Sequence, residues 1–174
     1  MNEPFGLQYV KTSIAVTGHR PHRLWGYDYS HPNYTTLGRT FRDMLIEHNA
    51  KRAISGMALG VDTIFAMVAL KLRDDNIIPD LQLECAIPCA NHSSKWRVES
   101  IQMYNNILER ADKITHVNTQ PFSADLMQKR NEYMVDNCDV LIAVWDGEPK
   151  GGTANCVQYA REKGVHVKII NPKI

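Results

Sequence analysis

The sequence predicts a three-layer α/β fold built on a mainly parallel sheet of five or six strands. Short apolar runs of strand length alternate with longer segments whose apolar residues recur at helical spacing. The chain has 174 residues, of which 44% are hydrophobic, and this is enough to bury the core of one domain. Three of the apolar runs end in glycine-bearing loops. We therefore expect a single domain over residues 1–174, with a core at about 13–172.

Six runs have the length and composition of strands. The clearest is DVLIAVW, because the six consecutive apolar residues after its aspartate are typical of a strand buried on both faces. The run KITHV is expected at an edge of the sheet. In chain order the predicted strands cover 13–17, 53–55, 81–87, 113–117, 139–145 and 165–170. Their order within the sheet stays open.

Helices are expected between these strands, since parallel strands need crossover connections. The strongest pattern follows Gly60, where Val61, Ile64, Phe65 and Val68 fall on one helical face. The other helices are predicted from about Tyr34, around 94–110, near 124–136 and at about 153–163. The polar and aromatic segment 19–33 is predicted to be a long loop.

Composition excludes several classes of protein. The net charge is +1, from 20 basic and 19 acidic residues, which argues against nucleic acid as the partner but permits a local anion site. No run approaches the ~20 apolar residues of a membrane span, and the N-terminus does not resemble a signal peptide, so a cytoplasmic protein is expected. The four cysteines have no repeated spacing and are predicted to be reduced, structural thiols.

Three predicted strands end in unusual sequences: TGHRP (17–21), SGMALGVD (55–62) and WDGEPKGGT (145–153). In open parallel sheets, ligands bind beyond the carboxyl ends of the strands, where the strand order reverses. We expect the three loops to meet there in one crevice. The candidate ligand-binding residues are Gly18, His19, Arg20, Ser55, Gly56, Leu59, Gly60, Asp62, Asp146, Gly147, Gly151, Gly152 and Thr153.

These residue types suit a phosphate-bearing ligand. Glycines allow positive φ and close approach of the backbone, and the helices that follow Gly60 and Gly152 offer free N–H groups to an anion. Thr153 is expected to cap the second of these helices. Arg20 is expected to clamp a phosphate. Asp62 has two interpretations: a first-turn acid favoured by the helix dipole, or a contact to a ribose or base.

Other motifs leave alternatives open or are absent. Neither G-x-G-x-x-G nor G-x-x-x-x-G-K-[ST] occurs, so dinucleotide binding of the usual type and a P-loop are unsupported. The irregular spacing of His19, His22, His31 and Asp28 does not favour a metal site, and none is expected.

Aromatic residues near these loops also have two interpretations. Trp25, Tyr27 and Tyr29 form either a lid that stacks on a base or a contact of the loop with the body of the domain. Trp96, between Lys95 and Arg97, is either an anchor for its helix or an outer wall of the same site.

Together, TGHRP, ISGMALGVD and NEYMVDNCDVLIAVWDGEPKGGTANCVQYA resemble the YpsA-like family of the SLOG superfamily, which is named for DprA/Smf and the LOG nucleotide hydrolases. The resemblance runs from about Ser13 to Pro172. It implies a Rossmann-like fold, a nucleotide-related ligand bound by these loops, a bacterial or phage origin, and a homodimer.

The chain departs from the hydrolases of that superfamily at one position. Those enzymes carry P-G-G-x-G-T-x-x-E, and the residue aligned with the glutamate here is Cys156, whose thiol cannot replace a carboxylate at an oxocarbenium-like centre. The resemblance therefore favours a sensor, regulator or sequestering protein for an ADP-ribose-like or nucleoside phosphate ligand, with no further cofactor. The alternatives are an N-glycosidic hydrolase, with Asp146, Asp62 or Glu99 as acid or base, and a protein-interaction adaptor without ligand.

Overall fold

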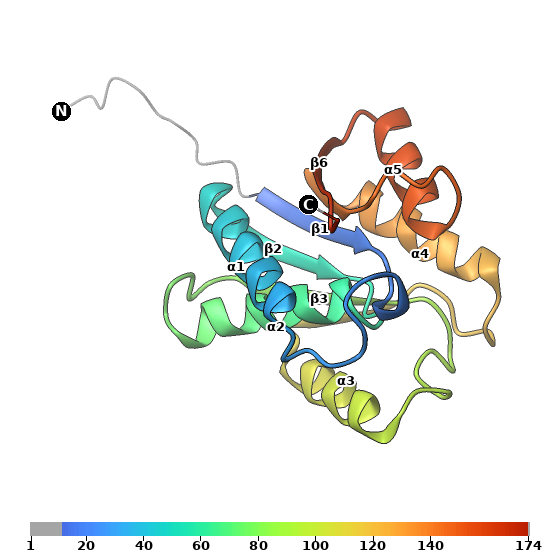
Figure 1. The fold of residues 1–174 in the computed structure, drawn as a ribbon, viewed down its shortest axis with the longest axis horizontal. Coiled ribbons are helices and arrows are strands. Elements are labelled where there is room, and N and C mark those ends of the chain that lie inside the picture. Colours follow the sequence, from blue (N-terminus) through green and yellow to red (C-terminus); the bar gives the residue numbers. More distant parts are fainter. Residues whose placement is uncertain (1–11, 174) are drawn as a thin grey trace.

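A computed structural model describes residues 12–173, and in it six parallel strands form one sheet in the order β4-β3-β2-β1-β5-β6 (Figure 1). This confirms the predicted α/β, Rossmann-like fold with a parallel sheet. The strands are β1 (Thr12–Gly18), β2 (Ala50–Ser55), β3 (Gln82–Ile87), β4 (Lys113–His116), β5 (Val140–Val144) and β6 (His166–Ile170).

Five α-helices cover the two faces of the sheet. The first face carries α1 (Pro32–Glu47), α2 (Val61–Asp74) and α3 (Val98–Arg110), and the second carries α4 (Ala124–Asp136) and α5 (Gly152–Glu162) (Figure 1). A short 3-10 helix, η1 (Pro21–Arg23), follows β1. No helix of the described part of the chain is long and apolar enough to cross a membrane.

Successive side chains of the central strands point to opposite faces of the sheet and contribute to two separate hydrophobic cores. In β1, Ile14 and Val16 pack into the core under α1, α2 and α3, whereas Ala15 packs into the smaller core under α4 and α5. In β5, Ile142 and Leu141 divide in the same way. Because both faces are covered, these strands read as continuous apolar runs.

Some predicted boundaries were wrong by a few residues, for local reasons. Helix α1 begins at Pro32, before the predicted Tyr34, because proline suits the first turn and His31 Nδ1 accepts the N–H of Asn33 at 3.2 Å. Helix α3 begins at Val98, since the preceding segment forms turns such as Trp96 N–H to the Ser93 carbonyl at 3.1 Å. The predicted loop 19–33 contains η1.

The strand order reverses between β1 and β5. From β1 the chain moves outward through β2, β3 and β4, and then returns to place β5 and β6 on the other side of β1. The carboxyl ends of β1 and β5 are therefore the switch point at which open α/β sheets bind ligands.

Candidate functional site

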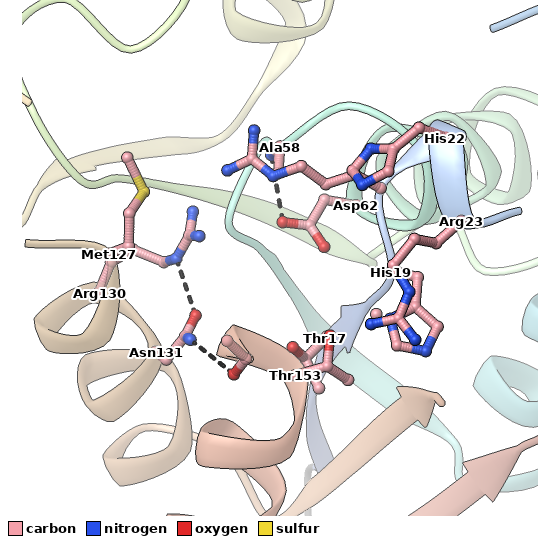
Figure 2. A pocket seen from close by; sticks show the side chains of 13 residues that line it. Thr17, His19, His22, Arg23, Ala58, Asp62, Met127, Arg130, Asn131 and Thr153 are labelled. Atoms are coloured by element: carbon pink, nitrogen blue, oxygen red, sulfur yellow. Dashed lines mark hydrogen bonds between the residues drawn. The ribbon is translucent and has the colours of Figure 1, made fainter. Parts of the chain in front are cut away.

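A cavity of about 180 Å³ lies at this switch point (Figure 2). It is formed by the loops that follow β1, β2 and β5, together with the first half of α4. We call it the arginine cavity. Its lining residues are Thr17, Gly18, His19, Arg20, His22, Arg23, Ala58, Asp62, Met127, Arg130, Asn131, Gly152 and Thr153.

Arg130, on α4, is the residue that the sequence analysis missed. Its guanidinium is buried at the wall of the cavity, where Nη1 donates to the Gly56 carbonyl and Nε donates to Asn131 Oδ1 at 3.1 Å (Figure 2). Burial lowers the pKa of Arg130, and the nearby Asp62 carboxylate opposes that shift. In the sequence, Arg130 and Asn131 interrupt the helix face formed by the apolar residues Leu126, Met134 and Val135. This interruption was the pattern that could have identified Arg130, and all five residues are buried in the structure.

Asp62 belongs to the first turn of α2 and also lines the cavity. Its Oδ2 accepts the N–H of Ala58 at 3.1 Å, and burial raises the pKa of the carboxyl despite the nearby Arg130. Ser55 stabilises the same loop, because its Oγ donates to the Asp62 carbonyl at 2.8 Å and accepts the Met57 N–H at 3.2 Å. Asp62 is thus a turn-forming acid with its side chain at the cavity wall.

Two glycines of the β2–α2 loop are required by close contacts within the protein. A Cβ on Gly56 would lie 2.7 Å from Cζ of Arg130. Gly60 has φ +92°, and a Cβ there would lie 3.1 Å from the His19 carbonyl oxygen. The Gly60 N–H donates to the Tyr29 hydroxyl at 2.7 Å. The expected close approach at these glycines therefore involves the protein's own side chains and backbone.

The first turn of α5 reaches the cavity through Gly152 and Thr153. Gly151, with φ +108°, is the N-cap residue, and no side chain caps the helix, so the expectation that Thr153 acts as a cap was wrong. The first N–H groups of a helix have no partner within the helix. They carry a partial positive charge and suit an anion.

Asp146 follows β5 and is engaged by three basic residues. Its carboxylate oxygens lie 2.8 Å from His19 Nε2, 3.2 Å from Arg23 Nη2 and 2.7 Å from Lys173 Nζ. Hydrogen bonds from Lys173 and His19 hold the pKa of Asp146 well below its ordinary value. The side chain is 4% exposed and does not line the cavity, so it orients His19 and Arg23 there.

Arg20 lies at the mouth of the arginine cavity. Its side chain is exposed and makes no hydrogen bond or ion pair with any described residue, and it also lines an adjoining cavity. Leu59, Gly147 and Glu99, which the sequence analysis also proposed, line neither cavity, and Glu99 is exposed in the first turn of α3.

Two aromatic residues of the loop 19–33, Trp25 and Tyr29, pack against the domain, whereas Tyr27 is exposed. Trp25 and Tyr29 make edge contacts with Tyr34, at centroid distances of 5.0 and 5.1 Å, and neither lines the arginine cavity. His31 stacks on Trp25 at 6.3 Å. Among the described residues, no group of three or more His, Cys, Asp or Glu side chains could hold a metal ion.

Cys156, on α5, is buried behind the cavity wall rather than exposed to a ligand. Burial raises the pKa of its thiol to about 12, and a hydrogen bond with Thr17 opposes the shift. All four cysteines are free, as predicted.

The charges of the arginine cavity favour an anion. Three arginines line it (Arg20, Arg23 and Arg130), whereas Asp62 is the only carboxylate among its lining residues. With the N-terminus of α5 at the same wall, the arrangement can accept a phosphate through both charge and hydrogen bonds.

Comparison with known proteins gives a family match and several relatives. Residues 14–173 match the model of the YspA SLOG family (YpsA). A UPF0398 protein of Halalkalibacterium halodurans is 27% identical over 154 residues, which are 86% of this chain and 80% of that protein. A UPF0398 protein of Bacillus thuringiensis is 27% identical over 155 residues, covering 87% and 83% of the two chains.

Two solved structures share the fold. DNA processing protein A (DprA) of Streptococcus pneumoniae superposes with a TM-score of 0.62 at 17% identity, over 94% of this chain and 51% of that one. DNA processing protein A of Helicobacter pylori, which has a single-stranded DNA binding mode, gives 0.60 at 18% identity, over 92% and 65%. The chain thus spans about half of the first protein and just under two thirds of the second.

Proposed function

Because the chain belongs to the YspA SLOG family, we propose that it binds a nucleotide-derived small molecule and acts as a sensor, regulator or sequestering protein. The observation that carries this proposal is the charge of the arginine cavity at the switch point of the sheet, where Arg20 and Arg130 face one lining carboxylate and Arg23 is already paired with Asp146. The ligand's phosphate would lie between Arg130, Arg20 and the N-terminus of α5.

Asp62 adds selectivity to this arrangement. A carboxylate at the cavity wall repels a second anion but accepts hydrogen bonds from hydroxyl groups, which a ribose supplies. A sugar phosphate therefore fits the combination of arginines and Asp62 better than a free inorganic anion does.

Single-stranded DNA is the ligand of the Helicobacter neighbour, whose likeness to this chain concerns the fold. The net charge of +1 on 174 residues argues for a compact ligand here, since proteins that track a nucleic acid backbone carry a clear basic excess. An oligodeoxythymidylate therefore belongs in the binding experiment as a competing probe.

Arg20→Ala tests the proposal with little risk to the fold, because the side chain is exposed and unpaired among the described residues. Loss of one charge-assisted hydrogen bond should weaken binding of a nucleoside monophosphate by about 1.5–3 kcal/mol. Calorimetric titration of the wild type and the variant with AMP, GMP, CMP, UMP and ADP-ribose measures this loss of affinity.

Arg39→Ala is the matched control, because Arg39 is an exposed arginine of α1 that lines a different part of the surface. It should bind the same ligands as the wild type. Equal affinities of the wild type and Arg20→Ala would remove Arg20 from the site. Absence of binding to every probe would overturn the proposed function.

A further inference from the structure

A second cavity, of about 230 Å³, adjoins the arginine cavity and shares Arg20 and Met127 with it. Neither cavity alone reaches the ~300 Å³ at which small-molecule sites usually begin, and the two together exceed it. The lining of the second cavity differs, because the rings of His92, Trp96 and Phe122 line it and Arg20 is its one arginine. Its lining residues are Arg20, Asn91, His92, Ser94, Lys95, Trp96, Phe122 and Met127, and we call it the aromatic cavity.

The aromatic cavity is built from two segments that hydrogen bonds hold together. Residues 90–96 follow β3, and residues 120–122 precede α4. The Ala90 N–H donates to the Gln120 carbonyl at 3.0 Å, and the Phe122 N–H donates to Asn91 Oδ1 at 2.9 Å. The walls are thus fixed before any ligand arrives, which lowers the cost of binding.

Packing also fixes two of its rings. Trp96 lies edge-on to His92 and to Tyr104, at centroid distances of 5.0 and 5.3 Å. His92 is anchored by its Nε2, which donates to the Met57 carbonyl at 2.9 Å. Burial and the nearby Arg130 lower the pKa of His92 to about 4, so the ring is neutral near pH 7.

Phe122 contrasts with these partly buried rings, because it is 60% exposed at the cavity wall. An exposed aromatic side chain gains most when a flat partner covers it, and every nucleobase offers such a face. Asn91 and Ser94 add hydrogen-bonding groups beside the rings.

We propose that the aromatic cavity holds the base of the ligand while the arginine cavity holds its phosphate, so that the ligand class is nucleoside phosphates rather than base-free sugar phosphates. This inference rests on the proposed function, because it assumes a phosphate in the arginine cavity. Arg20 lines both cavities, so the phosphate that it contacts lies beside the proposed base subsite. Lys95 supplies the other positive charge of the aromatic cavity.

Ribose 5-phosphate separates the two proposals, since it lacks a base. We expect the wild type to bind at least one of AMP, GMP, CMP and UMP about tenfold more tightly than ribose 5-phosphate, in keeping with the strength of base–aromatic stacking. Calorimetric titration of the full chain measures both affinities.

Phe122→Ala is the main variant, because an exposed ring contributes little to folding. This variant should lose most of the difference in affinity between the nucleotide and ribose 5-phosphate, while its affinity for ribose 5-phosphate stays unchanged. Trp96→Leu, checked for folding by circular dichroism, should act in the same direction. Tyr27→Ala is the control: Tyr27 is 50% exposed and lines neither cavity, so both affinities should stay as in the wild type.

Three results would overturn the inference. If ribose 5-phosphate binds as tightly as every nucleotide, the base has no subsite, although the proposed function survives. If Phe122→Ala weakens both probes equally, the ring does not recognise the base. If oligodeoxythymidylate binds but no mononucleotide does, the rings serve a nucleic acid, and the proposed small ligand fails with the inference.

Discussion

Asp146 and Arg20 are charged residues at the same edge of the sheet, but their surroundings give them opposite roles. The Asp146 carboxylate is engaged by His19, Arg23 and Lys173, and it contributes to the fold of the β5–α5 loop. The Arg20 guanidinium makes no hydrogen bond or ion pair with a described residue, although its charge acts on Asp62. A carboxylate that is already satisfied has little left to offer a ligand, whereas an unpaired guanidinium at a cavity mouth has its donors available.

The role of Asp146 can be measured through pH. Its folded-state pKa lies below the ordinary value of about 3.9, so ionised Asp146 stabilises the fold above that pH, and the stabilisation is lost as pH falls through the folded-state pKa. We expect Asp146→Asn to lower the melting temperature by several degrees at pH 7. The difference from the wild type should shrink only in strongly acidic solution.

Thermal unfolding between pH 2 and 8 measures this difference. Asp125→Asn is the control, because Asp125 makes only an exposed ion pair with Lys129, a kind of contact worth little. If the difference closed between pH 7 and 5, a group other than Asp146 would govern the stability of this loop.

Sequence reasoning brought residues to the cavity where a residue is local to its motif, and it missed residues that are not. Gly18, His19, Arg20, Asp62, Gly152 and Thr153 line the arginine cavity, and each stands in a loop or first helical turn directly after a predicted strand. Arg130 and Asn131 come from the other face of the sheet, and only the packing of α4 brings them to the cavity. The sequence argument considered only loops that follow the carboxyl ends of strands. It therefore could not identify residues in the middle of a helix such as α4.

At the scale of elements, α4 and the β2–α2 loop are fitted to each other. The Gly56 carbonyl accepts from the buried Arg130 guanidinium, and the missing side chain of Gly56 leaves the room in which that guanidinium lies. The loop therefore supports the arginine that faces the cavity. A substitution in the loop should therefore change the position of Arg130 in the cavity, even though the loop residue itself does not contact the ligand.

Gly56→Ala tests this fit. The added methyl group would collide with Arg130, and overpacking of this kind destabilises a fold by about 1–3 kcal/mol. Affinity for a nucleoside monophosphate should fall as well, because the guanidinium must move. Chemical denaturation and calorimetric titration measure the two effects.

Gly38→Ala is the matched control for that substitution. Gly38 lies within α1, where a Cβ would meet the nearest Val68 atom at an ordinary 3.6 Å. Alanine is the better helix former by about 0.5–1 kcal/mol, so this variant should be slightly more stable and bind equally well. A Gly56→Ala protein as stable as the wild type would show that Arg130 is free to move.

For the whole molecule, the alternation of strands and helices was enough to predict the fold class. The spacing of apolar residues that distinguishes a strand from a helix can be recognised within each short segment of the sequence. The strand order was not predictable, because β1 pairs with β5 across more than 120 residues, and no local pattern records that pairing. The switch point between β1 and β5 follows from that order. The parallel pattern was therefore enough to predict that the three loops meet at one edge of the sheet, but the switch point, Arg130 and the second cavity could not be predicted.

The two cavities offer several positive charges for binding but a single carboxyl group for glycosidic cleavage. Glycoside hydrolysis commonly uses two carboxyl groups, one as acid and one as base or nucleophile. Among the residues that line the two cavities, Asp62 is the only carboxylate. Asp146 is committed to its basic partners, Glu99 lines neither cavity, and Cys156 is buried with its thiol pKa raised to about 12.

We therefore expect no release of free base from AMP, GMP, CMP or UMP at an enzymatic rate, although at least one of them should bind. Chromatography of the nucleotides after long incubation measures release, and calorimetry on the same preparation measures binding. Asp62→Asn distinguishes the alternatives, because it removes the carboxylate that lines the cavity and keeps a similar shape. If the wild type releases base and Asp62→Asn does not, Asp62 is catalytic and the binding role gives way to hydrolysis. If neither protein releases base and Asp62→Asn binds the nucleotide more weakly than the wild type, the carboxylate serves recognition of the sugar.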